Sequence, residues 1–289
     1  MVQYLTSTRG KRLRPLLVMW SAEACGHVGA VPDQDTLLDV AAAFELAHMA
    51  SLVHDDIIDG AVQRRGLPAA YLIWGIHSAV LAGDYLFTRA NKVCLRHGVG
   101  SLVNQAIELT CEGEVAQDDR AFDSTVTERD YLSHICRKTA ALIGAACQAG
   151  ALMAGAGREV EESFLRYGIE LGCAFQIADD VMDLVADPKT SGKPRYNDIR
   201  RGILTLPLIL MMGKPSGKLI ERAFHERMVH DDLVDEVKRA CHRWGCIEQA
   251  RENARVLARS AESRLNVVQP SEARSALVSI ARGVVDRES

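Results

Sequence analysis

Four long apolar stretches with the periodicity of helices run through this sequence, and no segment alternates apolar and polar residues convincingly as a strand does. The stretches cover residues 37–58, 69–95, 131–155 and 164–185. The breaks between helical segments are short, and none is long or polar enough to separate two domains. The pattern therefore predicts one all-α domain over residues 1–289.

The composition is that of an ordinary soluble globular chain, with 48% hydrophobic residues and a net charge of −4. Because there is no strong basic excess, the overall charge offers no argument for a nucleic-acid partner. The eight cysteines show neither metal-site nor disulfide spacing, which favours a reducing, cytoplasmic location.

Two segments could be mistaken for export or membrane signals. Near the N-terminus a basic segment precedes apolar residues, but the apolar part is short and is interrupted by Pro15 and Glu23. The uncharged run 139–157 approaches membrane-spanning length. Its many Ala and Gly residues predict a tightly packed buried helix instead.

One acidic pattern occurs twice, as DDIID at 55–59 and DDVMD at 179–183, each within an apolar helical stretch. On a helix, the first and last carboxylates of such a pattern lie one turn apart on the same face. Crowded carboxylates repel each other unless a hard cation neutralises them, and oxygen ligands suit Mg²⁺, which also binds substrate phosphates. We therefore expect a magnesium diphosphate as ligand.

A third match, DDLVD at 231–235, shows that the bare pattern is weak evidence. It follows His230 in a polar stretch, so we interpret it as the solvated start of a helix rather than as a site. Much of the chain from Glu221 onward has the charged, amphipathic character of an outer face.

Basic clusters accompany the two acidic motifs, and phosphate oxygens are bound by such Arg and Lys side chains. The sequence GKRLRP at 10–15 precedes the first motif, and Arg64 and Arg65 follow it. A polar loop at 187–194, which contains Lys193, follows the second motif and is a candidate lid. A single basic cluster is as often a solvated surface, but the alternation of acidic and basic motifs favours a diphosphate site.

These motifs resemble those of the trans-isoprenyl diphosphate synthases, most closely the catalytic subunits of long-chain members such as hexaprenyl and heptaprenyl diphosphate synthases. The similarity runs from about residue 10 to residue 207 and comprises GKRLRP at 10–15, the first acidic motif with Arg64 and Arg65, GDYL at 83–86, KTA at 138–140, FQ at 175–176 before the second acidic motif, and GKP at 192–194. The resemblance implies a bundle of about ten or more helices around a central substrate cavity, the isoprenoid synthase fold.

The implied reaction is the head-to-tail condensation of isopentenyl diphosphate with an allylic prenyl diphosphate that ionises to a carbocation. The matching positions imply that about three Mg²⁺ ions lie on the allylic diphosphate, held by Asp55, Asp56, Asp59, Asp179, Asp180 and Asp183. They imply that the allylic diphosphate is gripped by Arg64, Lys138 and Lys193, and isopentenyl diphosphate by Lys11, Arg14, His48 and Arg65. Thr139 and Gln176 match residues whose oxygens face the carbocation. Without the resemblance, His48 would be interpreted as a satisfied core histidine.

The resemblance also bears on the length of the product, which in this family grows down a tunnel beneath the first acidic motif. The wall positions are Ala47, Ala50 and Ser51. Small side chains there leave room for a long all-trans product, about C30–C40 and suited to a quinone precursor, although small residues in helices also serve close packing.

The sequence departs from the family pattern at three positions and at the N-terminus. Arg9 stands where a second Gly is usual, Ala69 where Thr is common, and Ile203 where a Lys often follows Gly202. The loss of that Lys removes a potential phosphate contact, for which Lys193, Arg200 or Arg201 can compensate. A customary first helix also looks shortened, which suggests either a weaker fold or a partner subunit.

Three alternatives stay open. A class I terpene cyclase shares the fold and the first acidic motif but needs no isopentenyl diphosphate site. A metal-dependent phosphohydrolase would use His54 and Asp55 with His27 or His77, and would leave the second motif unexplained. A non-catalytic subunit would have no reason to keep carboxylates that repel each other.

The expected assembly is a homodimer or a heterodimer with a small subunit, since both occur in the family. We expect at most transient membrane contact, because a long prenyl product must leave for lipid.

Overall fold

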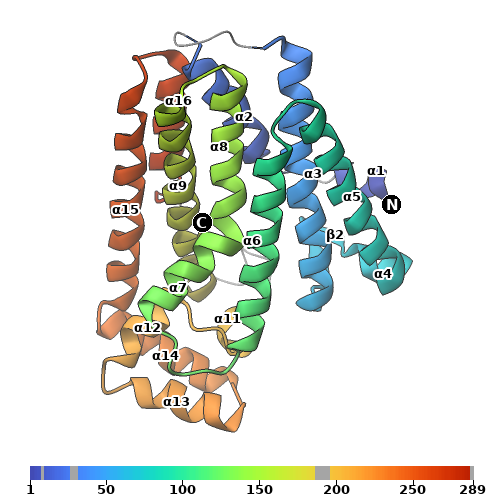
Figure 1. The fold of residues 1–289 in the computed structure, drawn as a ribbon. Coiled ribbons are helices and arrows are strands. Elements are labelled where there is room, and N and C mark those ends of the chain that lie inside the picture. The colour runs from blue at the N-terminus through green and yellow to red at the C-terminus, as the bar shows by residue number, and fades with distance from the viewer. Residues whose placement is uncertain (8–9, 27–31, 186–195, 287–289) are drawn as a thin grey trace. The chain divides into compact units, whose positions relative to one another are not determined.

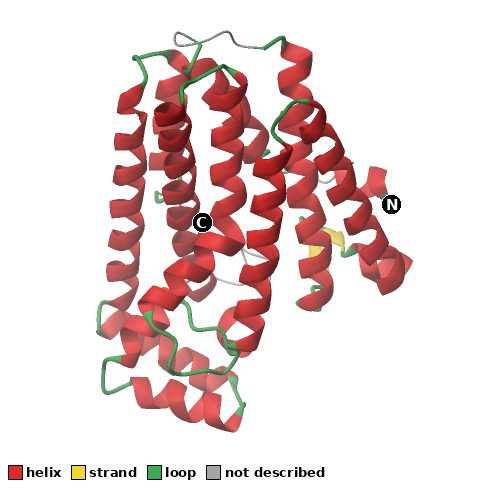
Figure 2. Cartoon of the chain, viewed as in Figure 1, coloured by secondary structure: helices red, strands yellow, loops and turns green. Residues whose placement is uncertain are grey.

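The computed structural model describes residues 1–289 except 8–9, 27–31, 186–195 and 287–289, and this part is almost entirely helical (Figure 2). Within it, the strands are β1 (Gln63–Arg64) and β2 (Leu67–Pro68), which form one antiparallel pair. The prediction of an all-α fold is confirmed.

The helices follow one another along the chain with short connections (Figure 1). They are α1 (Val2–Ser7), α2 (Leu13–Ala24), α3 (Gln34–Ile58), α4 (Ala70–Trp74), α5 (Ile76–Arg96), α6 (Gly100–Asp119), α7 (Glu128–Ile135), the π-helical turn η1 (Cys136–Ala140), α8 (Ala141–Met153), α9 (Arg158–Val185), α11 (Asn197–Arg200), α12 (Leu206–Met212), α13 (Gly217–Glu226), α14 (Asp231–Arg243), α15 (Cys246–Arg264), the 3₁₀ turn η2 (Leu265–Val267) and α16 (Glu272–Gly283). The stretch 69–95 forms two helices rather than one, because Gly75 adopts φ 81° and ends α4.

The chain divides into two compact units. Unit 1 comprises residues 1–108, 142–165 and 267–275, and unit 2 comprises residues 109–141, 166–266 and 276–289. The prediction that the chain is a single domain stays a prediction.

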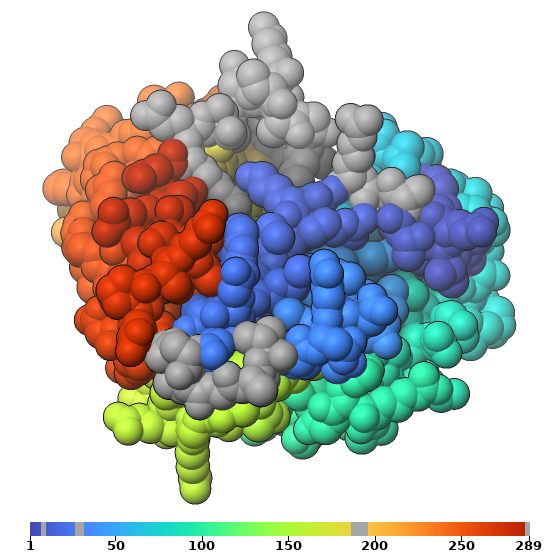
Figure 3. All heavy atoms as spheres, turned by 90° about the horizontal axis from the view of Figure 1, so that it is seen from above, coloured from blue at the N-terminus to red at the C-terminus, as the bar shows by residue number. Residues whose placement is uncertain are grey.

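In unit 1, α3 is the central helix and lies against α2 and α5 (Figures 1 and 3). Its first turn is fixed by Asp33, whose carboxylate accepts the Thr36 backbone N–H at 3.0 Å. By length and composition α3 could also cross a membrane, but 56% of its apolar window is buried, as in the core helix of a soluble protein.

The uncharged run that begins at Thr139 becomes the end of η1 and the buried helix α8, as predicted. Gly150 on α8 shows how closely this helix packs, because a Cβ there would lie 2.3 Å from the Val18 carbonyl oxygen on α2. Small residues therefore serve close helix packing in unit 1.

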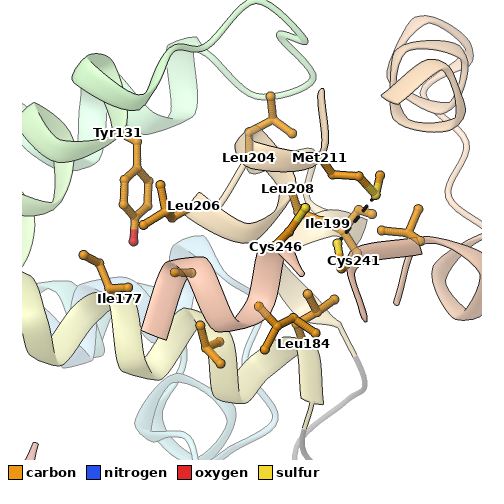
Figure 4. Close-up of a cluster of buried hydrophobic side chains, with 14 of the residues drawn as sticks. Tyr131, Ile177, Leu184, Ile199, Leu204, Leu206, Leu208, Met211, Cys241 and Cys246 are labelled. Carbon is orange, nitrogen blue, oxygen red and sulfur yellow. Dashed lines mark hydrogen bonds between the residues drawn. The ribbon is translucent and has the colours of Figure 1, made fainter. Parts of the chain in front are cut away.

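The core of unit 2 is an apolar cluster to which α7, η1, α9, α11, α12, α13, α14 and α15 contribute, and part of it is drawn in Figure 4. Its members include Tyr131, Ile177, Leu184, Ile199, Leu204, Leu206, Leu208, Met211, Cys241 and Cys246. Helix α7 enters this cluster from a capping box in which Thr127 Oγ1 accepts the Asp130 N–H and Asp130 accepts the Thr127 N–H.

Candidate active site

The first acidic motif lies at the C-terminal end of α3, in unit 1. The backbone N–H of Asp59 donates to the Asp55 carbonyl at 2.8 Å, so these two residues lie one helical turn apart, as the spacing predicts. Carboxylates at a helix C-terminus face the negative end of the helix dipole, which adds to their mutual repulsion. This end of α3 is therefore suited to a cation.

Asp56, the middle residue of the motif, has a different environment, because its side chain is buried and paired with Arg64. Oδ1 of Asp56 accepts from Arg64 Nε at 2.7 Å and from Nη2 at 2.5 Å. Burial raises the pKa of Asp56, while the Arg64 guanidinium acts in the opposite direction. Arg64 reaches this position from β1, at the two-residue turn of Arg65 and Gly66, both with positive φ.

A group of cationic side chains surrounds His48 on α3. Burial is the main cause that lowers the pKa of His48 well below its usual value, and the charges of nearby arginines lower it further, so the imidazole is neutral. These arginines are Arg14, Arg65, Arg64 and Arg12. Such a concentration of positive charge around a neutral ring is suited to a polyanion.

Arg14, on α2, is half-buried, and its enclosed Nε has no hydrogen-bond partner among the described residues. Burial lowers its pKa to about 10, and Glu45 opposes this shift. Glu45 is itself buried and accepts from Arg12 Nη1 at 2.7 Å. Arg12 and Glu45 were missed as site residues in the sequence, although Glu45 stands three positions before His48, on the same helical face.

Lys11 and Arg65 complete the set predicted for isopentenyl diphosphate, and both side chains are exposed. Gly10 lies against the Arg65 guanidinium, since a Cβ at position 10 would lie 2.5 Å from Arg65 Nη1. The structure therefore brings Arg14, His48 and Arg65 together in unit 1. Lys11 lies three positions before Arg14 in the chain.

The glycine of the sequence GDYL lies against the histidine that precedes the first acidic motif. A Cβ on Gly83 would lie 2.2 Å from His54 Nε2, so a side chain there would displace the imidazole. His54 Nε2 also lies 3.2 Å from the Val80 carbonyl oxygen and 3.6 Å from Asp84 Oδ1. His54 thus packs α3 against α5, whereas the phosphohydrolase alternative needs it as a metal ligand.

The predicted tunnel residues lie on α3, on the N-terminal side of the acidic motif. Ala47 and Ala50 are fully buried, and the Ser51 hydroxyl donates to the His48 carbonyl at 2.8 Å. Ala50 belongs to a small cluster with Met49 and Leu86, against which Leu5, Leu46 and Phe87 pack. Any larger side chain at position 50 must displace these neighbours.

The second acidic motif lies near the end of α9, in unit 2. Asp180 is buried, whereas Asp179 is exposed and Asp183 is half-buried. Asp180 accepts from Tyr131 Oη at 2.6 Å and from Gln176 Nε2 at 2.7 Å. Burial raises the pKa of Asp180 to about 7, against the effect of these two hydrogen bonds.

Thr139 and Gln176, both predicted to face the carbocation, are joined directly. Thr139 Oγ1 donates to Gln176 Oε1 at 2.7 Å, and so connects η1 with α9. Further along the chain, Asp198 is near the same motif, with its backbone N–H 3.4 Å from Asp183 Oδ2. Burial is the main cause that raises the pKa of Asp198 well above its usual range, and the negative charges of the motif add to it.

Lys138 lies on η1, with its ammonium directed to α6. Nζ lies 2.5 Å from Glu114 Oε2 and donates to Gln117 Oε1 at 2.8 Å. A Cβ on Gly113 would lie 2.7 Å from the Lys138 backbone nitrogen, so this glycine allows the π-helical turn to pack on α6. These two contacts leave one of the three ammonium N–H donors of Lys138 for a further acceptor. Lys193 and the loop at 187–194, like His27, lie outside the described residues.

The third acidic pattern is the start of α14, with Asp231 and Asp232 exposed in its first turn, as predicted. Asp231 pairs with Arg200. This copy is thus part of a solvated helix terminus.

The donor chemistry of the two true motifs fits a hard divalent cation, because their ligands are carboxylate oxygens. Among the described residues, no group of three or more His, Cys, Asp or Glu side chains forms a complete cage for a metal.

Comparisons with known proteins give a consistent result. A family model described as polyprenyl synthetase matches residues 1–241. A short chain isoprenyl diphosphate synthase of Methanothermobacter thermautotrophicus is 39% identical over 296 residues, covering 99% of this chain and 89% of the relative. The octaprenyl diphosphate synthase of Escherichia coli is 34% identical over 290 residues, covering 99% and 88%. A polyprenyl synthase of Caulobacter crescentus, solved with calcium and isoprenyl diphosphate, is 35% identical with a TM-score of 0.92, covering 99% and 88%.

Proposed function

Because this chain belongs to the polyprenyl synthetase family and is a prenyltransferase, we propose that it joins isopentenyl diphosphate to an allylic prenyl diphosphate and releases a long-chain all-trans product. In this reaction the allylic carbon–oxygen bond breaks and diphosphate leaves. The double bond of isopentenyl diphosphate then attacks the allylic carbocation, and a proton is lost from the adduct. The released diphosphate is the proposed base for that proton.

The observation that carries this proposal is the arginine group around the neutral His48. Arg14 is half-buried and its enclosed Nε has no partner among the described residues, and a guanidinium in such surroundings favours the binding of an anion. A terpene cyclase binds one diphosphate and does not need this second cationic group. We therefore favour a synthase that binds two diphosphates.

The proposed roles follow the matching positions. Arg14, His48, Lys11 and Arg65 bind isopentenyl diphosphate, and Arg64, Lys138 and Lys193 bind the allylic diphosphate. Thr139 and Gln176 direct oxygens toward the carbocation, for which their mutual hydrogen bond provides support.

We propose Mg²⁺ as the cofactor, about three ions per site. When bound, Mg²⁺ would neutralise the diphosphate and so stabilise it as a leaving group. The proposed ligands are the carboxylates of both acidic motifs, whose oxygens suit this ion. They are Asp55, Asp56, Asp59, Asp179, Asp180 and Asp183.

The proposed product has about six to eight isoprene units, because Ala47, Ala50 and Ser51 place small side chains between the helices of unit 1. The relatives above have names that range from short-chain to octaprenyl synthase. Product length therefore has to be measured on this chain.

The decisive experiment incubates the purified full chain with Mg²⁺, radiolabelled isopentenyl diphosphate and either farnesyl or geranylgeranyl diphosphate. Chromatography of the dephosphorylated products should give extended prenols and their length. Hydrocarbon formed from the allylic substrate alone would identify a cyclase instead. If the chain yields neither product, the assay is repeated with a candidate small subunit, and failure there refutes the synthase.

We also propose that the chain forms a homodimer, with a heterodimer as the alternative. The support is a group of exposed apolar side chains on α4 and α5. A soluble monomer usually exposes such side chains singly, whereas a group of them is typical of an interface. They are Leu72, Ile73, Trp74, Ile76, Val80, Leu81 and Tyr85. Light scattering should find a dimer that Leu81→Glu dissociates, whereas Val256→Glu, exposed on α15, should leave it intact. A monomeric wild-type chain would favour a heteromeric enzyme.

The proposed location is the cytoplasm, with at most transient contact with membranes as the product departs. Fractionation of cells that express the full chain tests this, and stable recovery with washed membranes would contradict it.

A further inference from the structure

Tyr131 is a buried tyrosine whose hydroxyl reaches an acidic motif. The side chain is 3% exposed and lies in the apolar cluster of unit 2, with Leu206 and Ile177 nearby (Figure 4). Its hydroxyl donates to Asp180 Oδ2 at 2.6 Å, from α7 to α9. A phenylalanine would fill the same space, so the specific contribution of the tyrosine is this hydrogen bond.

The opposite oxygen of Asp180 is held as well. Gln176 Nε2 donates to Asp180 Oδ1 at 2.7 Å, and Gln176 Oε1 accepts from Thr139 Oγ1 at 2.7 Å. Tyr131, Asp180, Gln176 and Thr139 therefore form one continuous chain of hydrogen bonds across α7, η1 and α9. Two donors on the two carboxylate oxygens fix the rotation of Asp180 and leave acceptor positions on both oxygens.

The backbone that carries Tyr131 is well defined. The Tyr131 N–H donates to the Thr127 carbonyl at 3.0 Å, directly after the capping box of Thr127 and Asp130. A donor on a fixed helical turn can orient a carboxylate with little freedom of movement. Tyr131 thus has the position and the rigidity of a supporting residue for a site.

We propose that Tyr131 is a positioning residue for the prenyl transfer reaction, which acts by orienting Asp180 and, through Gln176, the Thr139 hydroxyl. The proposal rests on the proposed function, since it assigns Tyr131 a role in that same site. It concerns a residue that does not touch the substrates itself.

The test compares Tyr131→Phe with Tyr167→Phe in the full chain. Tyr167 is also buried in unit 2 and donates its hydroxyl to the Leu277 carbonyl at 2.8 Å, so the second variant loses the same kind of bond away from the acidic motif. Tyr131→Phe should lower kcat about tenfold and raise the Mg²⁺ concentration for half-maximal rate, with the KM for isopentenyl diphosphate unchanged within about twofold. Tyr167→Phe should keep the wild-type kcat. Equal losses of kcat in the two variants, or a wild-type Tyr131→Phe, would overturn the proposal.

A second measurement does not depend on turnover. Calorimetry with Mg²⁺ and farnesyl thiolodiphosphate, an inert allylic analogue, should show binding about tenfold weaker for Tyr131→Phe than for wild type. In the Asp180→Ala background, Tyr131→Phe should change that affinity by less than about twofold, because its target is gone. A full tenfold effect in that background would refute action through Asp180. If the wild type forms no prenyl product either alone or with a small subunit, the proposed function fails, whereas this binding cycle still decides whether Tyr131 acts through Asp180.

Discussion

The buried carboxylate of Asp56 pairs with the partly exposed guanidinium of Arg64 and so joins the end of α3 to β1, with Arg64 Nε 2.7 Å from Asp56 Oδ1. The middle aspartate of the second motif, Asp180, is likewise buried and held by protein donors. The two motifs therefore share a division of roles. In each, the middle carboxylate is held within the protein, while the outer carboxylates are more accessible.

Asp56→Ala should lower the free energy of unfolding, because it leaves the Arg64 guanidinium without its buried partner. The expected loss is roughly 1–2 kcal/mol, since the partly exposed guanidinium can be hydrated, and urea unfolding measures it. Arg64→Ala should cost a similar amount, and the double variant should cost less than the sum. Additive losses would show that the ion pair is not the source of the stability.

Asp55→Ala should lower the activity without lowering the stability of the fold. It removes a predicted metal ligand and one of several carboxylates that repel each other, so kcat should fall by at least about 100-fold while the melting temperature stays equal or rises. Circular dichroism checks the fold, and the prenyl transfer assay checks the rate. Unchanged activity would remove Asp55 from the metal site.

The sequence predicts the long helices because their apolar periodicity needs no tertiary information. Helices α3 and α9 therefore lie where the pattern places them, and the outer aspartates of the first motif are one turn apart. The break at Gly75 was missed because a lone Gly inside an apolar run is weak evidence for a helix end.

The polar contacts of the site were harder to predict, because they join residues that local patterns do not relate. Tyr131 precedes Asp180 by 49 positions and reads as an ordinary core aromatic in its own helix. The π-helical turn at Lys138 depends on the close approach of Gly113 from α6, which no local pattern encodes. The pairing of Lys138 with Glu114 has the same origin.

Ala50→Phe should shorten the prenyl product by several isoprene units, since the new ring must occupy space beside Leu86 and Met49. The added volume should also cost about 1–3 kcal/mol of stability. Ala42→Phe is the matched control, because Ala42 lies on the same helix but is exposed. Chromatography of the dephosphorylated products measures the change, and an unaltered length in Ala50→Phe would remove this position from the tunnel wall.

His134 should make the protein less stable in mild acid. Burial, followed by the charge of Lys138, lowers its pKa from 6.5 to about 4, so the folded state favours the neutral ring. Its Nδ1 is also buried without a hydrogen-bond partner among the described residues. Since the unfolded chain binds this proton more tightly, the contribution of His134 to stability is complete above pH 6.5 and declines as the pH falls toward 4.

The expected loss from this single group is up to roughly 3 kcal/mol, at about 1.4 kcal/mol for each unit of pKa shift. Urea unfolding at a series of pH values between 7.5 and 4 measures the slope. His134→Gln should have a shallower slope, because glutamine does not titrate. His225 lies exposed on α13, so His225→Gln serves as the control and should keep the wild-type slope. Equal slopes in the wild type and in His134→Gln would place the acid sensitivity in other groups.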